Sequence, residues 1–249
     1  MLKNRLLLLA LIVIICGFTF KPADKITIWM MGDSTMSIKK KEAYPEAGWG
    51  MPFANYWDTT VDVQNTAQNG RSTKSFISES RWKPIENGMK KGDYLLIQFG
   101  HNDEVPTKKS YTTPTEFTAN LTAFVKAAKE KGATPVLITP VARRKFDSTG
   151  VLQNTHKQYS QLVREVATAQ KVVLIDLDAK SQALYKQLGP ENSKHLLLHL
   201  APGQNPNHPT GKEDDTHFNE YGARLMAEIV MNDIKVQLPE LAKRLLNKK

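Results

Sequence analysis

Short apolar runs that alternate with longer amphipathic segments constrain the fold of this chain more than any other feature. Five runs of strand-forming residues lie at 25–31, 60–64, 93–99, 134–139 and 171–177. The longer segments carry apolar residues at the spacing of a helix with one buried face, over residues 115–131, 155–170 and 218–236. Strands that alternate with helices form βαβ units, in which the strands pair in parallel and the helices cover the sheet. We therefore predict a three-layer α/β/α fold, flavodoxin-like, around a central parallel sheet of about five strands.

The composition is that of a globular protein. Hydrophobic residues make up 41% of the chain and charged residues 24%, which excludes a disordered chain and a protein that spans a membrane many times. No internal repeat and no linker rich in Pro, Gly or Ser interrupts residues 23–249, so we expect a single domain there. Residues 194–215 hold three prolines and two glycines, and are expected to form one long loop.

The first 22 residues have the pattern of a secretory signal peptide. Lys3 and Arg5 precede an uncharged run at residues 6–20, which is shorter than the ~20 residues that span a bilayer as a helix. We predict cleavage between residues 17 and 23, export to the periplasm or beyond, and no membrane span afterwards. An uncleaved anchor is the alternative. Lipid attachment at Cys16, the only cysteine, is disfavoured by the bulky Ile15 before it.

The distribution of charge argues against a nucleic-acid partner. The formal net charge is +9, but six basic residues lie near the two ends, and without them 28 basic residues face 25 acidic ones. The chain also lacks zinc-finger and RNA-recognition signatures. We expect no nucleic acid to bind, and only a modest attraction to acidic polymers.

Four polar blocks carry the residues that could perform chemistry, and each also has an ordinary structural explanation. Ser34 can cap a helix, Gly70 can form an Asn-Gly turn, and Asn102 can belong to any polar loop. Asp214 and His217 can be an acid and a surface histidine at the start of the last predicted helix. The blocks are GDSTM at 32–36, QNGRS at 68–72, GHND at 100–103 and DDTH at 214–217.

The same residues are equally suited to acyl transfer, because sites in parallel sheets form at the carboxyl ends of the strands. A serine at a strand-to-helix turn exposes its hydroxyl and offers its backbone N–H to an oxyanion. Asp214 and His217 are three residues apart, so on one turn the carboxylate can orient the imidazole. Asp215 is expected to point to solvent or to cap the helix that starts near Phe218.

Taken in order, the blocks resemble the SGNH hydrolase superfamily, also called GDSL-type esterases. GDSTM, NGRST, FGHND, DDTHFNEYGA and TPVARRKF further resemble the rhamnogalacturonan acetylesterase family, carbohydrate esterase family twelve. The resemblance implies that Ser34 is the nucleophile, His217 the base and Asp214 its orienting partner. It also implies an oxyanion hole made of the backbone N–H groups of Ser34 and Gly70 and the side-chain amide of Asn102.

The activity that this resemblance implies is a secreted carbohydrate esterase. It would remove O-acetyl groups from a pectic polysaccharide, rhamnogalacturonan foremost, through an acyl-enzyme and without a metal or organic cofactor. The alternatives are a deacetylase of another glycan such as xylan, a lipase or thioesterase, and a non-catalytic glycan-binding protein on the same fold. The joint presence of Ser34, Asp214 and His217 argues against the last of these.

The remaining candidates are basic side chains. Arg71, Arg143 and Arg144 are ordinarily solvated, although in a pectin esterase they could instead contact galacturonate carboxylates, Arg71 and Arg143 foremost. His101 is expected to bond within its own loop. His195 and His199 are four residues apart but lack the glutamate of an H-E-x-x-H motif, so we expect no metal site.

Overall fold

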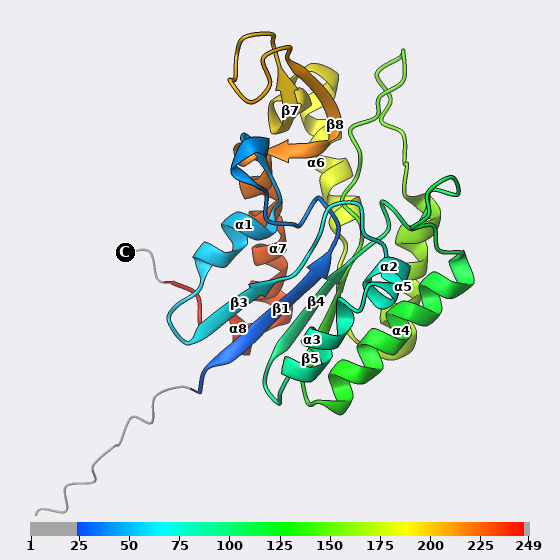
Figure 1. The fold of residues 1–249 in the computed structure, drawn as a ribbon, viewed down its shortest axis with the longest axis vertical. Coiled ribbons are helices and arrows are strands. Elements are labelled where there is room, and N and C mark those ends of the chain that lie inside the picture. The colour runs from blue at the N-terminus through cyan, green and yellow to red at the C-terminus, as the bar shows by residue number, and fades with distance from the viewer. Residues whose placement is uncertain (1–23, 247–249) are drawn as a thin grey trace, which may run out of the picture.

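The computed structural model describes residues 24–246, so the predicted signal peptide and Cys16 lie outside the described residues. Its centre is a parallel sheet with the strand order β3-β1-β4-β5-β6 (Figure 1). The strands are β1 (Ile26–Gly32), β3 (Val61–Asn65), β4 (Tyr94–Gln98), β5 (Thr134–Ile138) and β6 (Val173–Ile175). The predicted α/β fold with a central parallel sheet of five strands is therefore confirmed.

The burial of each strand follows its place in the sheet. In the central strands β4 and β5 every residue after the first is buried, as expected where helices cover both faces. The edge strand β3 instead alternates between half-buried and exposed residues. The strand predicted at 171–177 is only three residues long, because Asp176 already caps the next helix by accepting a hydrogen bond from the backbone N–H of Ala179.

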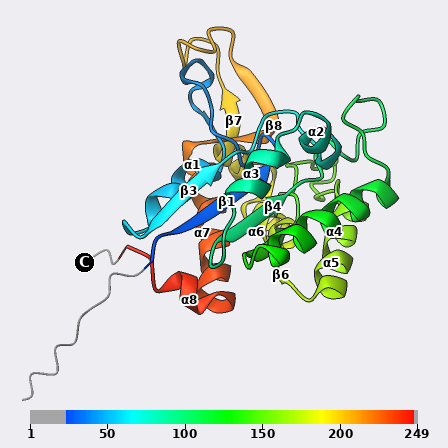
Figure 2. The same ribbon diagram turned by 60° about the horizontal axis from the view of Figure 1, so that its bottom comes forward.

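Helices cover the two faces of the sheet (Figures 1 and 2). One layer packs around buried residues such as Phe117 and Phe124, and consists of α2 (Thr73–Ser78), α3 (Trp82–Gly88), α4 (Pro114–Glu130) and α5 (Lys157–Gln170). The other layer consists of α1 (Gly50–Phe53), α6 (Leu177–Asn192), α7 (Glu220–Gln237) and α8 (Pro239–Ala242). Among residues 24–246, no helix combines the length and the apolar character needed to cross a membrane.

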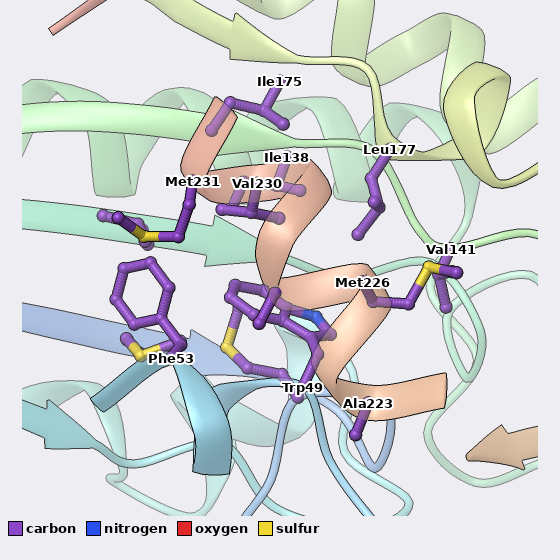
Figure 3. Close-up of a cluster of buried hydrophobic side chains, with 14 of the residues drawn as sticks. Trp49, Phe53, Ile138, Val141, Ile175, Leu177, Ala223, Met226, Val230 and Met231 are labelled. Carbon is purple, nitrogen blue, oxygen red and sulfur yellow. The ribbon is translucent and has the colours of Figure 1, made fainter. Parts of the chain in front are cut away.

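Hydrophobic packing between α1 and α7 holds the part of the chain around Trp49 and Phe53, which follows β1, in place. Figure 3 shows Trp49 and Phe53 packed beside Met226, Val230 and Met231 of α7. The indole N–H of Trp49 donates to Gln98 Oε1 at 2.6 Å, so this buried polar group is satisfied at the end of β4.

A second, antiparallel sheet lies beyond the carboxyl ends of the parallel strands (Figure 1). It contains β2 (Glu46–Ala47), β8 (Lys212–Asn219) and β7 (Leu197–Leu200), in that order. The prediction of one long loop at 194–215 is wrong, since a 3-10 helix (Ser193–Leu196) and β7 occupy its first part and β8 begins at Lys212. The prolines and glycines lie in the turn between two strands whose pairing is not visible in local periodicity.

The last long helix also begins later than predicted. Residues 214–217 lie on β8, and α7 begins at Glu220, where the Asn219 side chain accepts a hydrogen bond from the backbone N–H of Gly222. Phe218 is a buried strand residue, so its apolar character reflects β8 and not the helix.

Gly222 is the tightest point of this junction. A Cβ added there would overlap the carbonyl oxygen of Leu196, in the 3-10 helix before β7. We expect Gly222→Ala to lower the free energy of unfolding by about 1–3 kcal/mol, the usual cost of overpacking. Urea unfolding measures this. Tyr221→Ala is the control, because Tyr221 is 59% exposed on the same helix and should change stability by less than about 0.5 kcal/mol. Equal stabilities of the two variants would contradict the prediction.

Candidate active site

One hollow at the carboxyl ends of β1 and β4 brings the four polar blocks together. Its volume is about 310 Å³, and the residues that line it include Ser34, Gly70, Asn102, Asp214 and His217. The other lining residues are Glu46, Asn69, His101, Lys108, Arg143, Lys212 and Thr216.

A continuous chain of hydrogen-bonding groups joins Ser34, His217 and Asp214. His217 Nε2 lies 2.9 Å from Ser34 Oγ, and His217 Nδ1 lies 2.8 Å from Asp214 Oδ2. Partial burial alone would raise the pKa of Asp214, but hydrogen bonds from the His217 ring and from backbone N–H groups hold that pKa well below its usual value. The ionised carboxylate keeps a proton on Nδ1, so the lone pair on Nε2 faces the serine hydroxyl.

A bulge in β8 makes the contact between Asp214 and His217. Opposite β7 the register moves from Leu198↔Asp214 to Leu197↔Phe218, so residues 215–217 bulge out of the ladder. Asp214 Oδ1 accepts the backbone N–H groups of Thr216 and His217 at 2.8 and 2.9 Å, which closes the bulge. The two side chains therefore meet at a bulge in a strand. The sequence predicted a tight turn or the first turn of a helix, and the helical alternative is wrong.

Asp215 is exposed, as the sequence predicted, and it does not cap α7. Its Oδ1 also accepts a hydrogen bond from Arg144 at 2.6 Å and lies 2.8 Å from His199 Nε2, two contacts that the sequence did not predict. Arg144 is not a solvated surface charge, because it is 7% exposed and donates to the carbonyl oxygen of Pro190. Its burial depends on the long-range contact between β8 and the loop after β5.

The orientation of the Asn102 amide is set by two partners. Asn102 Nδ2 donates to the carbonyl oxygen of Arg71 at 3.0 Å, and Lys108 Nζ donates to Asn102 Oδ1 at 2.9 Å. A carbonyl can only accept and an ammonium can only donate, so this pair of contacts excludes the flipped amide. Gly70 has φ +76°, a left-handed conformation that favours glycine, while no atom lies near enough to exclude a side chain.

Two sets of buried polar groups hold the turn that carries Ser34. Lys39 Nζ donates to the carbonyl oxygen of Ser34 at 2.5 Å and forms an ion pair with Glu46 at 2.8 Å. Gln98 Nε2 donates to Thr35 Oγ1 at 2.6 Å, and Thr35 Oγ1 donates to Asp33 Oδ1 at 2.8 Å. Sequence reasoning missed Lys39, because it stands in a run of three lysines typical of a surface.

The remaining histidines and arginines are held by tertiary contacts. The ring of His101 packs edge-on against His156, with 4.3 Å between centroids, and is not held by its own loop as expected. Burial lowers the pKa of His101 well below its usual value. Arg143 donates to Thr216 Oγ1 at 2.8 Å, and Arg71 donates to Glu79 at 3.0 Å. Residues 24–246 hold no group of three side chains suited to a metal ion, and His195 does not line the hollow.

The buried carboxyl group of Asp103, next to Asn102, should make the stability of the fold depend on pH. Its Oδ1 accepts the backbone N–H and the hydroxyl of Thr73 at 2.9 and 2.6 Å. Burial raises the pKa of Asp103 from its ordinary 3.8 to about 7. The folded protein therefore keeps a proton that the unfolded chain releases above pH 3.8, and stability from this group falls as pH rises towards about 7.

Asp103→Asn should remove this dependence, because the amide keeps the Oδ1 acceptor and carries no ionisable proton. We expect the difference in unfolding free energy, variant minus wild type, to rise between about pH 4 and pH 7 and to level off above. Urea unfolding at a series of pH values measures it. A difference that stays constant across this range would show that Asp103 has no raised pKa.

Comparison with known proteins assigns the family. Residues 30–225 match the GDSL-like Lipase/Acylhydrolase family. Rhamnogalacturonan acetylesterase RhgT of Bacillus subtilis (strain 168) is 43% identical over 211 residues, which cover 84% of this chain and 90% of that protein. The probable rhamnogalacturonan acetylesterase YesY of the same organism is 35% identical, with 84% and 92% covered. The crystal structure of B. subtilis YxiM superimposes with a TM-score of 0.73 at 30% identity, over 87% of this chain and 58% of that one. The chain thus belongs to the GDSL-like lipase/acylhydrolase family and is an esterase.

Proposed function

We propose that this esterase removes O-acetyl groups from a pectic polysaccharide, rhamnogalacturonan foremost, through an acyl-enzyme on Ser34. The observation that carries the chemistry is the Asp214–His217–Ser34 hydrogen-bonded chain, which opens into a solvent-accessible polar hollow. The proposed substrate class rests on RhgT, which is named a rhamnogalacturonan acetylesterase. The alignment of the two proteins covers 84% of this chain and 90% of RhgT.

The steps follow from the positions of the groups. His217 Nε2 removes the proton of Ser34 Oγ as this oxygen attacks the ester carbonyl. The tetrahedral intermediate collapses when its bond to the sugar oxygen breaks and His217 gives the proton to that oxygen, which leaves as the free hydroxyl and leaves an acetyl ester on Ser34. Water then donates its proton to His217 while it attacks this ester, and acetate leaves as the Ser34 hydroxyl forms again.

The oxyanion of each intermediate would be held by the backbone N–H groups of Ser34 and Gly70 and by the Asn102 amide. This assignment is supported by the common hollow that the three residues line. Lys108 supports it further, because an ammonium group on Asn102 Oδ1 polarises the amide and strengthens its N–H donors.

The lining of the hollow favours a polar, acidic substrate. Lys108, Arg143 and Lys212 contribute three cations against the two carboxylates of Glu46 and Asp214, while no large apolar side chain lines the cavity. A lipase or thioesterase would need such an apolar surface for its acyl chain. Arg143 lines the hollow and is proposed to contact a uronate carboxylate, because its only carboxylate neighbour among the described residues, Glu104, is 3.9 Å away, whereas Arg71 lies 3.0 Å from Glu79.

Export belongs to the same proposal. The basic residues and the short apolar run at the start of the chain support it, and a polymer of this kind is degraded outside the cell membrane. A mature N-terminus between residues 18 and 24 in the secreted protein would agree with it.

The function is tested by acetate release from acetylated rhamnogalacturonan, acetylated homogalacturonan and acetylxylan. We expect the highest kcat/KM on rhamnogalacturonan, and no release by the Ser34→Ala variant. A serine-directed organophosphate should add its mass to the peptide that contains Ser34. A preference for acetylxylan would replace the proposed substrate with the alternative glycan, and turnover by Ser34→Ala would refute the nucleophile.

Substitution of the two adjacent aspartates should have different effects, one on kcat and the other on the free energy of unfolding. Asp214→Asn removes the carboxylate that orients His217, so kcat should fall by an amount that approaches ~10⁴-fold, with little change in stability. Asp215→Asn leaves the buried Arg144 without its charged partner, so it should lower the unfolding free energy by about 1–3 kcal/mol and change kcat only a few-fold. The reverse pattern would refute the assignment of Asp214.

Substitutions of Asn102 and of Lys108 should both weaken the stabilisation of the oxyanion, to different extents. Asn102→Ala should lower kcat by about 10²–10³-fold, the usual cost of one oxyanion donor. Lys108→Met should lower kcat on 4-nitrophenyl acetate by a smaller factor and leave KM nearly unchanged, because the lysine acts through the amide. Lys108→Arg should restore part of the loss. An effect of Lys108→Met confined to KM would contradict this role.

A further inference from the structure

A second hollow opens directly beside the active site. Its volume is about 460 Å³, within the range of ~300–1,000 Å³ typical of ligand pockets. It shares Gly70 and Lys108 with the active-site hollow, so a ligand could extend from one into the other. We call it the lysine hollow, lined by Gly70, Arg71, Lys74, Ser75, Ser78, Glu79, Lys108, Lys109 and Ser110.

The charge of the lysine hollow is strongly positive. Four of its lining residues are basic and one, Glu79, is acidic. Glu79 is held by two arginines, at 2.5 Å from Arg81 Nε and 3.0 Å from Arg71 Nε, so its charge is already compensated. Hydrogen bonds from these arginines lower the pKa of Glu79, which keeps it ionised and paired.

Lys74 and Lys109 are the cations available to a ligand. Both are exposed, and neither lies within ion-pair distance of a carboxylate in the part of the chain that the structure describes. Lys74 does interact with Glu116 over a longer distance, since the hydrogen bonds of Thr113 and, to a smaller extent, the charge of Lys74 lower the pKa of Glu116. The third lysine, Lys108, is bonded to the Asn102 amide. Unpaired cations gathered in a concave surface attract and retain an anion.

The position of the hollow indicates what anion it receives. A ligand there can be continuous with the molecule whose ester lies at Ser34, because the two hollows meet at Gly70 and Lys108. We propose that the lysine hollow is a subsite in which Lys74 and Lys109 bind the carboxylate of a uronate residue further along the acetylated polymer. This inference rests on the proposed function, and it identifies lysines, rather than Arg71, as the groups that contact the acid.

Binding remote from the ester should discriminate between substrates. A subsite that holds a neighbouring uronate raises kcat/KM for the charged polymer and has no effect on a small ester that never reaches it. It should also make turnover of the polymer depend on salt, since exposed charges are screened over a Debye length of ~10 Å at 0.1 M salt.

The test uses the double variant Lys74→Gln/Lys109→Gln and the matched control Lys126→Gln, which removes an exposed lysine from α4 outside both hollows. For the double variant we expect kcat/KM on acetylated rhamnogalacturonan to fall about tenfold, from the loss of two exposed ion pairs. On acetylxylan and 4-nitrophenyl acetate it should stay within twofold of wild type. Added salt should bring the wild type down towards the variant, and the control should resemble the wild type throughout.

A second measurement separates this inference from the proposed function. Unacetylated oligogalacturonate should inhibit hydrolysis of 4-nitrophenyl acetate by the wild type and by Lys126→Gln, and inhibit the double variant about tenfold more weakly. If the wild type binds the oligomer in this way but releases no acetate from any polysaccharide, the proposed function fails and the subsite stands. If the wild type deacetylates the polymer and the double variant matches the control in both measurements, the subsite is refuted.

Discussion

The bulge in β8 is the feature on which the rest of the site depends. Ser34 follows the end of β1, in the parallel sheet, whereas His217 and Asp214 come from a separate antiparallel sheet. A regular strand would turn side chains three residues apart to opposite faces. The bulge at residues 215–217 instead aligns Asp214 with His217, and the pairing of Asp215 with the buried Arg144 ties the same segment to the loop after β5. Neighbouring aspartates thus have separate tasks, one in orienting the imidazole and one in anchoring the strand.

Buried polar groups hold the turn at Ser34 from the opposite side. Lys39 and the chain from Trp49 through Gln98 and Thr35 to Asp33 keep the turn at Ser34 in one conformation. Such groups are costly to bury, and each of these residues has at least one hydrogen-bond partner, although Asp33 Oδ2 has none. Because these contacts hold the turn in place, the Ser34 hydroxyl already lies within hydrogen-bond distance of His217 Nε2, and the site needs little reorganisation to react.

The cations around the site act at increasing distance from the ester. Lys108 bonds the amide proposed to hold the oxyanion, Arg143 lines the same hollow, and Lys74 and Lys109 lie in the adjoining one. This order is consistent with the acidic polymer proposed as substrate, even though the net charge outside the two ends of the chain is only +3. The positive electrostatic potential of these side chains is concentrated at the two hollows rather than over the whole surface of the protein.

The sequence alone determined the parallel sheet and its flanking helices, because these depend on local periodicity. It also identified Ser34, Gly70, Asn102, Asp214 and His217 as residues of one site, through the resemblance of their sequence blocks to a known family. Only the tertiary structure decided that residues 197–200 and 212–219 pair as strands, that Asp214 reaches His217 through a bulge, and that Lys39 and Arg144 are buried. The pairing partners of β7, β8 and these two cations are far away in the chain. Their positions depend on contacts that leave no periodic signal, so a lysine in a basic run and an arginine beside another arginine looked like surface charges until the fold brought Glu46 and Asp215 to them.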